Sequence, residues 1–269
     1  MNTIGFVGSG NMAEALIKGI IAAKIYTPEN VFISDIRSEQ LEFLGDKYGV
    51  VAVENNAELA GKVETLVLSI KPQNMNDALE SIKDTISSET LVISIAAGIK
   101  IEKIAAVLGD MAIIRVMPNT PALIGEGASG LYANEQAKSL LEKAVSICSS
   151  VGKAVVVDNE DLIDAVTAVS GSGPAYYFLL MEEMVNAGIK LGLPETVAKD
   201  LVLQTAKGAG LLAVEADKND ESPAELRRKV TSPGGTTEAA LKALAESDFS
   251  RLINDALAAA CNRSKELSG

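Results

Sequence analysis

The residues nearest the start of the chain have the spacing of a dinucleotide-binding turn. A short apolar run, Ile4 to Val7, is followed by Gly8, Gly10 and Ala13 in the pattern G-x-G-x-x-A, and an amphipathic segment begins at once. In a strand-turn-helix of this kind the first glycine permits the sharp turn, the second lets a pyrophosphate approach the backbone, and the small third residue lets the helix lie close to the strand. The free N–H groups of the helix then face an anion. A plain strand-helix turn is the alternative, and the position after a strand and before a helix favours the dinucleotide.

A second stretch, residues 230–241, is rich in hydroxyls and glycine and leads directly into a helical pattern. Its centre reads Ser232-Pro-Gly-Gly-Thr-Thr237. Paired glycines free the backbone to turn several N–H groups inward, which makes an anion-binding nest at a helix N-terminus. An ordinary helix cap needs only one Ser or Thr. We therefore expect this loop to hold a substrate carboxylate, with Thr237 offering its hydroxyl to a neighbouring atom.

The composition excludes several kinds of chemistry. The 269 residues contain no histidine, so Ser-His and Cys-His catalysis and most zinc sites are excluded, and we expect no metal. The two cysteines, Cys148 and Cys261, are far apart, which argues against a disulfide framework. A net charge of −12 argues against nucleic acid and anionic membranes as partners. With neither a membrane-length apolar run nor a signal-peptide pattern, we expect a cytoplasmic protein.

The elements that position the first site alternate between strand and helix as far as residue 158. Apolar runs without polar alternation indicate buried parallel strands; they are predicted at residues 4–7, 31–34, 50–53, 65–70, 91–95, 113–117, 130–132 and 154–157. This order predicts an α/β fold, a Rossmann-type doubly wound parallel sheet with right-handed crossovers. We assign residues 1–158 to a dinucleotide-binding domain.

Residues 159–269 contain no convincing strand and are predicted to form an all-helical domain. Residues 166–191 are almost continuously apolar, interrupted by Ser170-Gly-Ser-Gly-Pro174. A helix that is apolar all round is buried on all sides, and in a domain this small a partner chain is expected to cover it. Further helices are predicted at about residues 199–215, 224–230 and 249–260, so we expect a homodimer built on this domain.

The choice between the two nicotinamide cofactors stays open at this stage. The second strand ends at Ser34, Asp35 and Arg37. An acidic residue at such a strand end binds the ribose hydroxyls of NAD, whereas a nearby Arg accommodates the 2′-phosphate of NADP. Asp35 favours NAD(H), and Ser34 with Arg37 favours NADP(H).

Taken together, these stretches resemble the Δ1-pyrroline-5-carboxylate reductase family. The resemblance spans nearly the whole chain, and its motifs come in the family's order: Gly8–Ala13, Lys71-Pro72, Ala96–Gly98, Met117–Pro121, Asp161–Thr167, Ser170–Tyr176 and Ser232–Thr237. The last two are specific to that family, whereas many dehydrogenases share the first.

The resemblance implies reduction of the cyclic imine of 1-pyrroline-5-carboxylate to L-proline by NADP(H), with NAD(H) also possible. It implies a helical dimer, which in the family often assembles as five dimers in a ring. It implies cofactor contacts from Gly8, Ser9, Gly10, Asn11, Met12, Ala13, Ser34, Arg37, Asn56, Ser69, Ile70, Lys71, Pro72, Ile95, Ala96 and Ala97. Asp35 departs from the family's pattern, and its place at the strand end predicts a cofactor contact as well. It implies substrate contacts from Glu160, Ser232, Gly234, Gly235, Thr236 and Thr237, with Thr237 bonded to the ring nitrogen.

Two other functions fit parts of the sequence. A β-hydroxyacid dehydrogenase would use a lysine general acid in the helical domain, for which Lys190 and Lys199 are the nearest candidates. Neither lies in a polar, glycine-rich setting, so we interpret both as surface residues. A non-catalytic NADPH sensor would keep the first glycine turn but would need no second polar loop.

Overall fold

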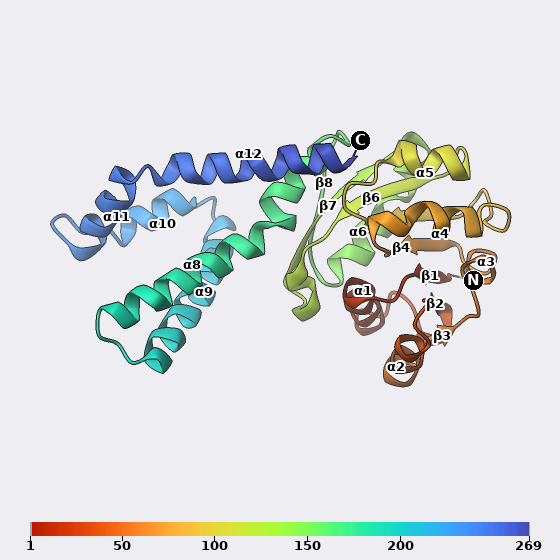
Figure 1. Cartoon of the computed structure of the whole chain (residues 1–269), viewed down its shortest axis with the longest axis horizontal. Helices are drawn as coiled ribbons and strands as arrows, with labels where there is room; N and C mark the ends of the chain where they lie inside the picture. Colours follow the sequence, from red (N-terminus) through yellow and green to blue (C-terminus); the bar gives the residue numbers. More distant parts are fainter. Residues whose placement is uncertain (1, 269) are drawn as a thin grey trace. The chain divides into compact units, whose positions relative to one another are not determined.

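The computed structural model describes residues 2–268, which contain one eight-stranded sheet and a set of helices (Figure 1). The strands are β1 (Ile4–Val7), β2 (Val31–Ser34), β3 (Val51–Ala52), β4 (Thr65–Leu68), β5 (Leu91–Ser94), β6 (Ile113–Met117), β7 (Gly127–Ala133) and β8 (Gly152–Val156). Their order in the sheet is β3-β2-β1-β4-β5-β6-β7-β8. The chain therefore leaves β1 in both directions along the sheet, as a doubly wound fold requires.

Helices cover both faces of this sheet. One core cluster joins the sheet to α1 (Asn11–Ala22), α2 (Ser38–Tyr48) and α6 (Leu141–Ser149), and the other joins it to α3 (Asn56–Ala60), α4 (Met75–Ile82) and α5 (Ile101–Leu108). Within β1, Ile4 and Phe6 belong to the first cluster and Val7 to the second. A strand buried on both faces has no polar side to show, which explains the continuous apolar runs in the sequence.

The sheet is parallel from β3 to β6, but β7 pairs antiparallel with β6. The fully parallel sheet predicted from the sequence is wrong at this point, although the fold class is confirmed. The chain between Met117 and Gly127 carries only a 3-10 segment, Thr120–Ile124, and is too short for the helical crossover that a parallel neighbour needs. The next connection contains α6, and β8 accordingly runs parallel to β7.

The remainder of the described chain is helical, as predicted. Its elements are α7 (Leu162–Val166), a π-helical turn (Thr167–Gly171), α8 (Gly173–Lys190), α9 (Glu195–Asp217), α10 (Pro223–Lys229), α11 (Thr236–Glu246) and α12 (Phe249–Ser268). Further 3-10 segments lie at Pro28–Asn30, Pro72–Asn74 and Glu135–Leu140. None of the helices described here is long and apolar enough to cross a bilayer.

Internal contacts divide the chain into two compact units. The sheet unit continues to Pro174 and includes the chain from Leu257 onward, and the helical unit is Ala175–Ala256. The end of α12 thus packs with the sheet, whereas the sequence pattern assigned everything after residue 158 to the helical domain. This division depends on contacts between residues far apart in the chain, and such contacts produce no periodic pattern in the sequence.

Candidate active site

The turn between β1 and α1 requires glycine at its first position. Gly8 has a φ of +86°, and its N–H donates to the carbonyl of Ser34 over 2.9 Å. A Cβ at this position would lie 2.9 Å from the carbonyl oxygen of Ser69, whose hydroxyl donates to the carbonyl of Gly8 over 2.7 Å. The turn is thereby clamped between the ends of two neighbouring strands.

The second glycine has a different reason to be present. Gly10 is the N-cap of α1 and has an extended backbone that any residue can adopt, φ −75° and ψ −175°. A Cβ built there meets no atom within 4 Å. No atom of residues 2–268 fills this space at the N-terminus of a twelve-residue helix, where backbone N–H groups and the helix dipole favour an anion. The turn therefore has room for a phosphate group where a side chain would stand.

An open cleft of about 710 Å³ begins at this turn. The predicted residues that line it are Gly8, Gly10, Ser34, Asp35, Arg37, Asn56, Ser69, Ile70 and Lys71. Other predicted cofactor residues do not line the cleft: Ser9, Asn11, Met12, Ala13, Pro72, Ile95, Ala96 and Ala97. Of these, Ala13 is buried where α1 packs against the sheet, and Ser9 is buried in the turn itself.

A chain of hydrogen bonds organises one wall of the cleft. The hydroxyl of Ser34 donates to Oδ1 of Asn56 over 2.7 Å, and Nδ2 of Asn56 donates to the hydroxyl of Ser81 over 3.1 Å. Ser81 in turn donates to the carbonyl of Ala78 over 2.6 Å. A ligand atom that accepts from the Ser34 hydroxyl, such as a phosphate oxygen, has to take the place of Asn56, so the two residues act together.

The carboxylate of Asp35 forms two hydrogen bonds with the guanidinium of Arg37, one on each oxygen. Partial burial pushes the pKa of Asp35 upward, but hydrogen bonds from the Arg37 side chain and from the N–H groups of Ser9 and Arg37 outweigh it and hold the pKa below its ordinary value. The Arg37 side chain remains 53% exposed. The pair is therefore fully charged at neutral pH and adjoins the cleft.

Sequence reasoning missed several residues of the cleft. The cleft is also lined by Val7, Ile36, Asn74, Asp77, Ala78 and Ser81. Ile36 is 98% exposed, and it lies between two predicted cofactor residues, Asp35 and Arg37. An isolated apolar residue in a polar turn was the available signal. The α4 residues gave none, because only the fold brings that helix beside the strand ends.

Glu160 belongs to a polar network inside the sheet unit. Its Oε1 accepts from the N–H of Ile101, the first residue of α5, over 2.8 Å and from Nη1 of Arg115 over 3.2 Å. Arg115 is buried on β6, and its Nη2 lies 3.9 Å from Oδ1 of Asp164, which accepts from the hydroxyl of Ser264 over 2.6 Å. This predicted substrate residue thus has protein partners of its own, which connect β6, α5, α7 and α12.

The second predicted site lies in the helical unit, on the loop that enters α11. Gly234 has a φ of +71°, and its N–H donates to Oε2 of Glu238 over 2.7 Å. The N–H of Gly235 donates to the carbonyl of Ser232 over 3.0 Å. Thr237 is half-buried, while Ser232, Gly234 and Thr236 are exposed. The loop is therefore exposed at a helix N-terminus, with the N–H of Gly234 bonded to a carboxylate of its own chain and the N–H of Gly235 bonded to a carbonyl of the loop.

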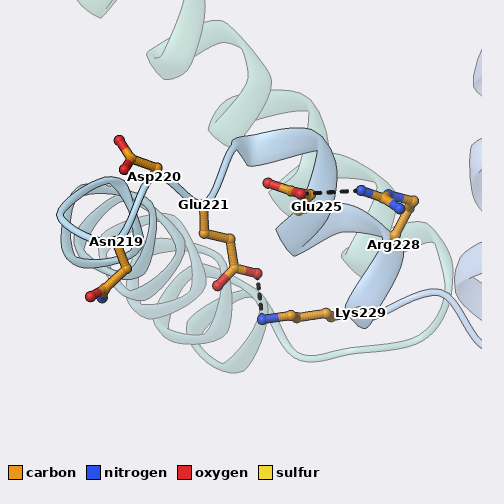
Figure 2. Close-up of a pocket in the computed structure, with 6 residues that line it drawn as sticks. All are labelled: Asn219, Asp220, Glu221, Glu225, Arg228 and Lys229. Atoms are coloured by element: carbon orange, nitrogen blue, oxygen red, sulfur yellow. Dashed lines mark ion pairs between the residues drawn. The ribbon is translucent and has the colours of Figure 1, made fainter.

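A hollow of about 530 Å³ in the same unit is bordered by charged side chains from the loop after α9 and from α10 (Figure 2). Its ion pairs are Glu221–Lys229, at 2.5 Å, and Glu225–Arg228, at 3.5 Å. Asp220 and Asn219 complete the lining. Because α10 ends at Lys229, the residues that line this hollow come directly before the 230–235 loop in the sequence.

Comparison with known proteins decides the family. Residues 160–267 match the family model described as pyrroline-5-carboxylate reductase dimerisation, and residues 3–98 match that of the coenzyme F420-dependent NADP oxidoreductases. A pyrroline-5-carboxylate reductase of Pseudomonas aeruginosa is 46% identical over 98% of this chain and 96% of its own length. This chain belongs to the pyrroline-5-carboxylate reductase family.

Solved structures of pyrroline-5-carboxylate reductases have the same fold. The protein from Coxiella burnetii superposes with a TM-score of 0.93 at 40% identity, covering 100% of this chain and 99% of that one. The protein from Plasmodium falciparum, solved with NADP bound, gives 0.85 at 33% identity, covering 100% of this chain and 98% of that one. The family expected from the motifs is confirmed. Lys190 and Lys199, which a β-hydroxyacid dehydrogenase would need, are both exposed.

Proposed function

We propose that this chain reduces 1-pyrroline-5-carboxylate to L-proline, the last step of proline biosynthesis, with NADPH as the hydride donor. The full-length relationship to pyrroline-5-carboxylate reductases carries the proposal. The P. falciparum relative binds NADP, and the cleft at the Gly8–Ala13 turn of this chain fits the same cofactor. We also propose that residues 1–158 are the dinucleotide-binding domain and residues 159–269 the dimerisation and substrate domain. The family match over residues 160–267 supports this boundary, although the chain up to Pro174 and the end of α12 pack with the sheet unit.

The cofactor contacts follow from the cleft. N–H groups at the start of α1 hold the pyrophosphate in the space beside Gly10, and Ser34, Arg37 and Asn56 hold the adenosine end. The remaining contacts are those of Ser9, Asn11, Met12, Ala13, Ser69, Ile70, Lys71, Pro72, Ile95, Ala96 and Ala97, while Asp35 adjoins the adenosine end through its hydrogen bonds to Arg37. Bound NADPH supplies a hydride from its nicotinamide ring.

The 232–237 loop orients the substrate. The substrate carboxylate takes the place of Glu238 on the N–H of Gly234, beside Ser232, Gly235 and Thr236. The hydroxyl of Thr237 bonds to the ring nitrogen. When hydride reaches the imine carbon, the electron pair of the C=N bond moves to the nitrogen, which already carries a proton. The chain therefore needs no histidine acid, and it contributes orientation and charge complementarity.

Glu160 is also proposed as a substrate residue. Both of its hydrogen bonds given above use Oε1. Its side chain is 19% exposed, and its negative charge suits a cationic imine.

The helical domain is proposed to form a homodimer. Large apolar side chains of α8 and α9 are exposed in the single chain, among them Tyr177 at 67%, Phe178 at 60%, Leu211 at 55% and Val214 at 68%. A second copy would remove this surface from water. Five such dimers in a ring, acting in the cytoplasm, are the assembly and location that the family suggests. The molar mass from light scattering distinguishes a dimer from a ring of five dimers.

The function is tested by following NADPH and NADH oxidation with pyrroline-5-carboxylate and with a panel of 3-hydroxy acids. We expect turnover only with the cyclic imine. Thr237→Ala should lower kcat/KM by about 10- to 100-fold, the range for loss of one hydrogen bond to a charged group, while NADPH binding survives. Thr237→Ser should restore activity, and Ser88→Ala, an exposed hydroxyl before β5, serves as control. Full turnover in Thr237→Ala would reject the assigned role.

A further inference from the structure

The Asp35 carboxylate at the end of β2 accepts hydrogen bonds from N–H groups of two residues. Oδ1 accepts from the backbone N–H of Arg37 over 2.9 Å and from its Nε over 3.0 Å. Oδ2 accepts from the backbone N–H of Ser9 over 2.7 Å and from Nη2 of Arg37 over 2.9 Å. One carboxylate therefore joins the phosphate-binding turn to the arginine that borders the cleft.

These contacts use the whole accepting capacity of the group. A carboxylate offers about four lone-pair sites, and each oxygen of Asp35 already has two donors. The side chain is also only 6% exposed. A ribose hydroxyl that donated to Asp35 would have to displace either the buried Ser9 N–H or a guanidinium N–H, and would leave that donor without a partner. Asp35 is therefore a poor ligand for a ribose diol in this arrangement.

Arg37, by contrast, keeps donors available. Its guanidinium has five N–H groups, of which Nε and one of Nη2 bond to Asp35. Within residues 2–268 no further acceptor is bonded to the other three. A bidentate pair fixes the plane of the guanidinium, and a fixed planar fork is the geometry that suits phosphate oxygens.

We propose that Asp35 is a positioning residue that orients Arg37 for a 2′-phosphate, so that it favours NADPH although its position at the strand end is that of an NAD-selecting acid. The inference rests on the proposed function for its cofactor class. Ser34 and Asn56 line the same end of the cleft, and the Asp35–Ser9 hydrogen bond holds this end in register with the pyrophosphate turn.

The two roles of Asp35 predict opposite changes on substitution. If Asp35 positions Arg37, Asp35→Ala weakens the binding of NADPH more than that of NADH. The ratio of kcat/KM for NADPH to kcat/KM for NADH then falls. If Asp35 instead binds the ribose diol, the same variant weakens the binding of NADH more. It also strengthens the binding of NADPH, because it removes a negative charge beside the 2′-phosphate. The sign of the change in the ratio therefore decides between them.

The decisive measurement is calorimetric binding of two adenosine halves, adenosine 2′,5′-bisphosphate and adenosine 5′-monophosphate, to the full-length protein. We expect Asp35→Ala to weaken the binding of the bisphosphate by about tenfold, which is the effect of losing one charge-assisted hydrogen bond. The binding of the monophosphate should weaken much less. Arg37→Ala should lose the same selectivity, and the double variant should be no worse than Arg37→Ala. Asp46→Ala, an exposed carboxylate on α2, is the matched control. Asp35→Asn, which keeps one acceptor oxygen, replaces Asp35→Ala if that variant does not fold.

Three outcomes would overturn the positioning role. They are equal weakening of the binding of both halves by Asp35→Ala, additive effects of the two substitutions in the double variant, or a gain in affinity for the bisphosphate. A wild-type protein that selects the bisphosphate but reduces no cyclic imine would overturn the proposed reaction and leave this inference intact. A wild-type protein that binds neither half would overturn both.

Discussion

The backbone N–H of Gly234 donates to the carboxylate of Glu238 over 2.7 Å, four residues further along the chain and inside the first turn of α11. The N-terminus of this helix is thus capped by a carboxylate of its own chain. The proposed substrate also carries a carboxylate, and it would have to displace Glu238 from this N–H. We infer that Glu238 occupies the anion position when substrate is absent.

Glu238→Gln should therefore lower the KM for pyrroline-5-carboxylate. Removing one negative charge near the incoming anion is worth about 0.3–1 kcal/mol at an exposed helix terminus, which corresponds to about a two- to fivefold lower KM. Glu246→Gln, at the other end of α11, is the matched control and should leave KM unchanged. A raised KM in Glu238→Gln would show that Glu238 assists binding rather than competing with it.

The two glycines of the cofactor turn should respond differently to alanine. Gly10→Ala adds a Cβ that meets no atom of the described chain within 4 Å, so the free energy of unfolding should change little. The Kd for NADPH should rise about tenfold or more, because the methyl group takes space needed by the pyrophosphate. Gly8→Ala places a Cβ against the Ser69 carbonyl at a φ of +86° and should cost about 2 kcal/mol of stability or more. Chemical denaturation and fluorescence titration of NADPH measure the two effects. Loss of stability in Gly10→Ala without loss of affinity would contradict the assignment.

The buried cation of β6 should matter more for stability than an exposed one. Arg115→Met leaves the carboxylates of Glu160 and Asp164 without their cation, and Asp164 is only 2% exposed. Breaking a buried pair from one side costs about 3–5 kcal/mol. Arg251→Met, which removes an exposed arginine paired with Asp248 at 2.8 Å, should cost less than about 1 kcal/mol. Denaturant midpoints of the two variants make the comparison, and equal losses would mean that the Arg115 network contributes little.

Cys148 should be chemically inert in the folded protein. Burial raises the pKa of its thiol to about 12, so at pH 8 about one molecule in ten thousand carries the reactive thiolate. Iodoacetamide at pH 8 should leave Cys148 unlabelled until denaturant is added, as mass spectrometry of its peptide would show. The unfolded chain releases this proton near its ordinary pKa of 9.0, and the folded chain only near 12. The free energy of unfolding should therefore fall as the pH rises above 9, and less steeply in Cys148→Ala. Rapid labelling of the native protein would contradict this burial.

Local patterns in the sequence determined much of this protein. The apolar runs located the strands because those at the centre of the sheet, β1, β4 and β5, are buried on both faces. The glycine spacing located the turn because only particular backbones permit it. The Ser232–Thr237 loop was recognisable because its hydroxyls and glycines exceed what a helix cap needs. The family followed from the order of such motifs.

The tertiary structure decided what depends on residues far apart in the chain. The reversal of β7 follows from a connection too short for a crossover. The saturation of Asp35 needs the N–H of Ser9, twenty-six residues earlier, beside the strand end. The partners of Glu160 come from β6 and the start of α5, and those of Asp164 from the end of α12. Hydrogen bonds between distant residues produce no periodicity, so a carboxylate that looks free in the sequence can be fully bonded in the fold.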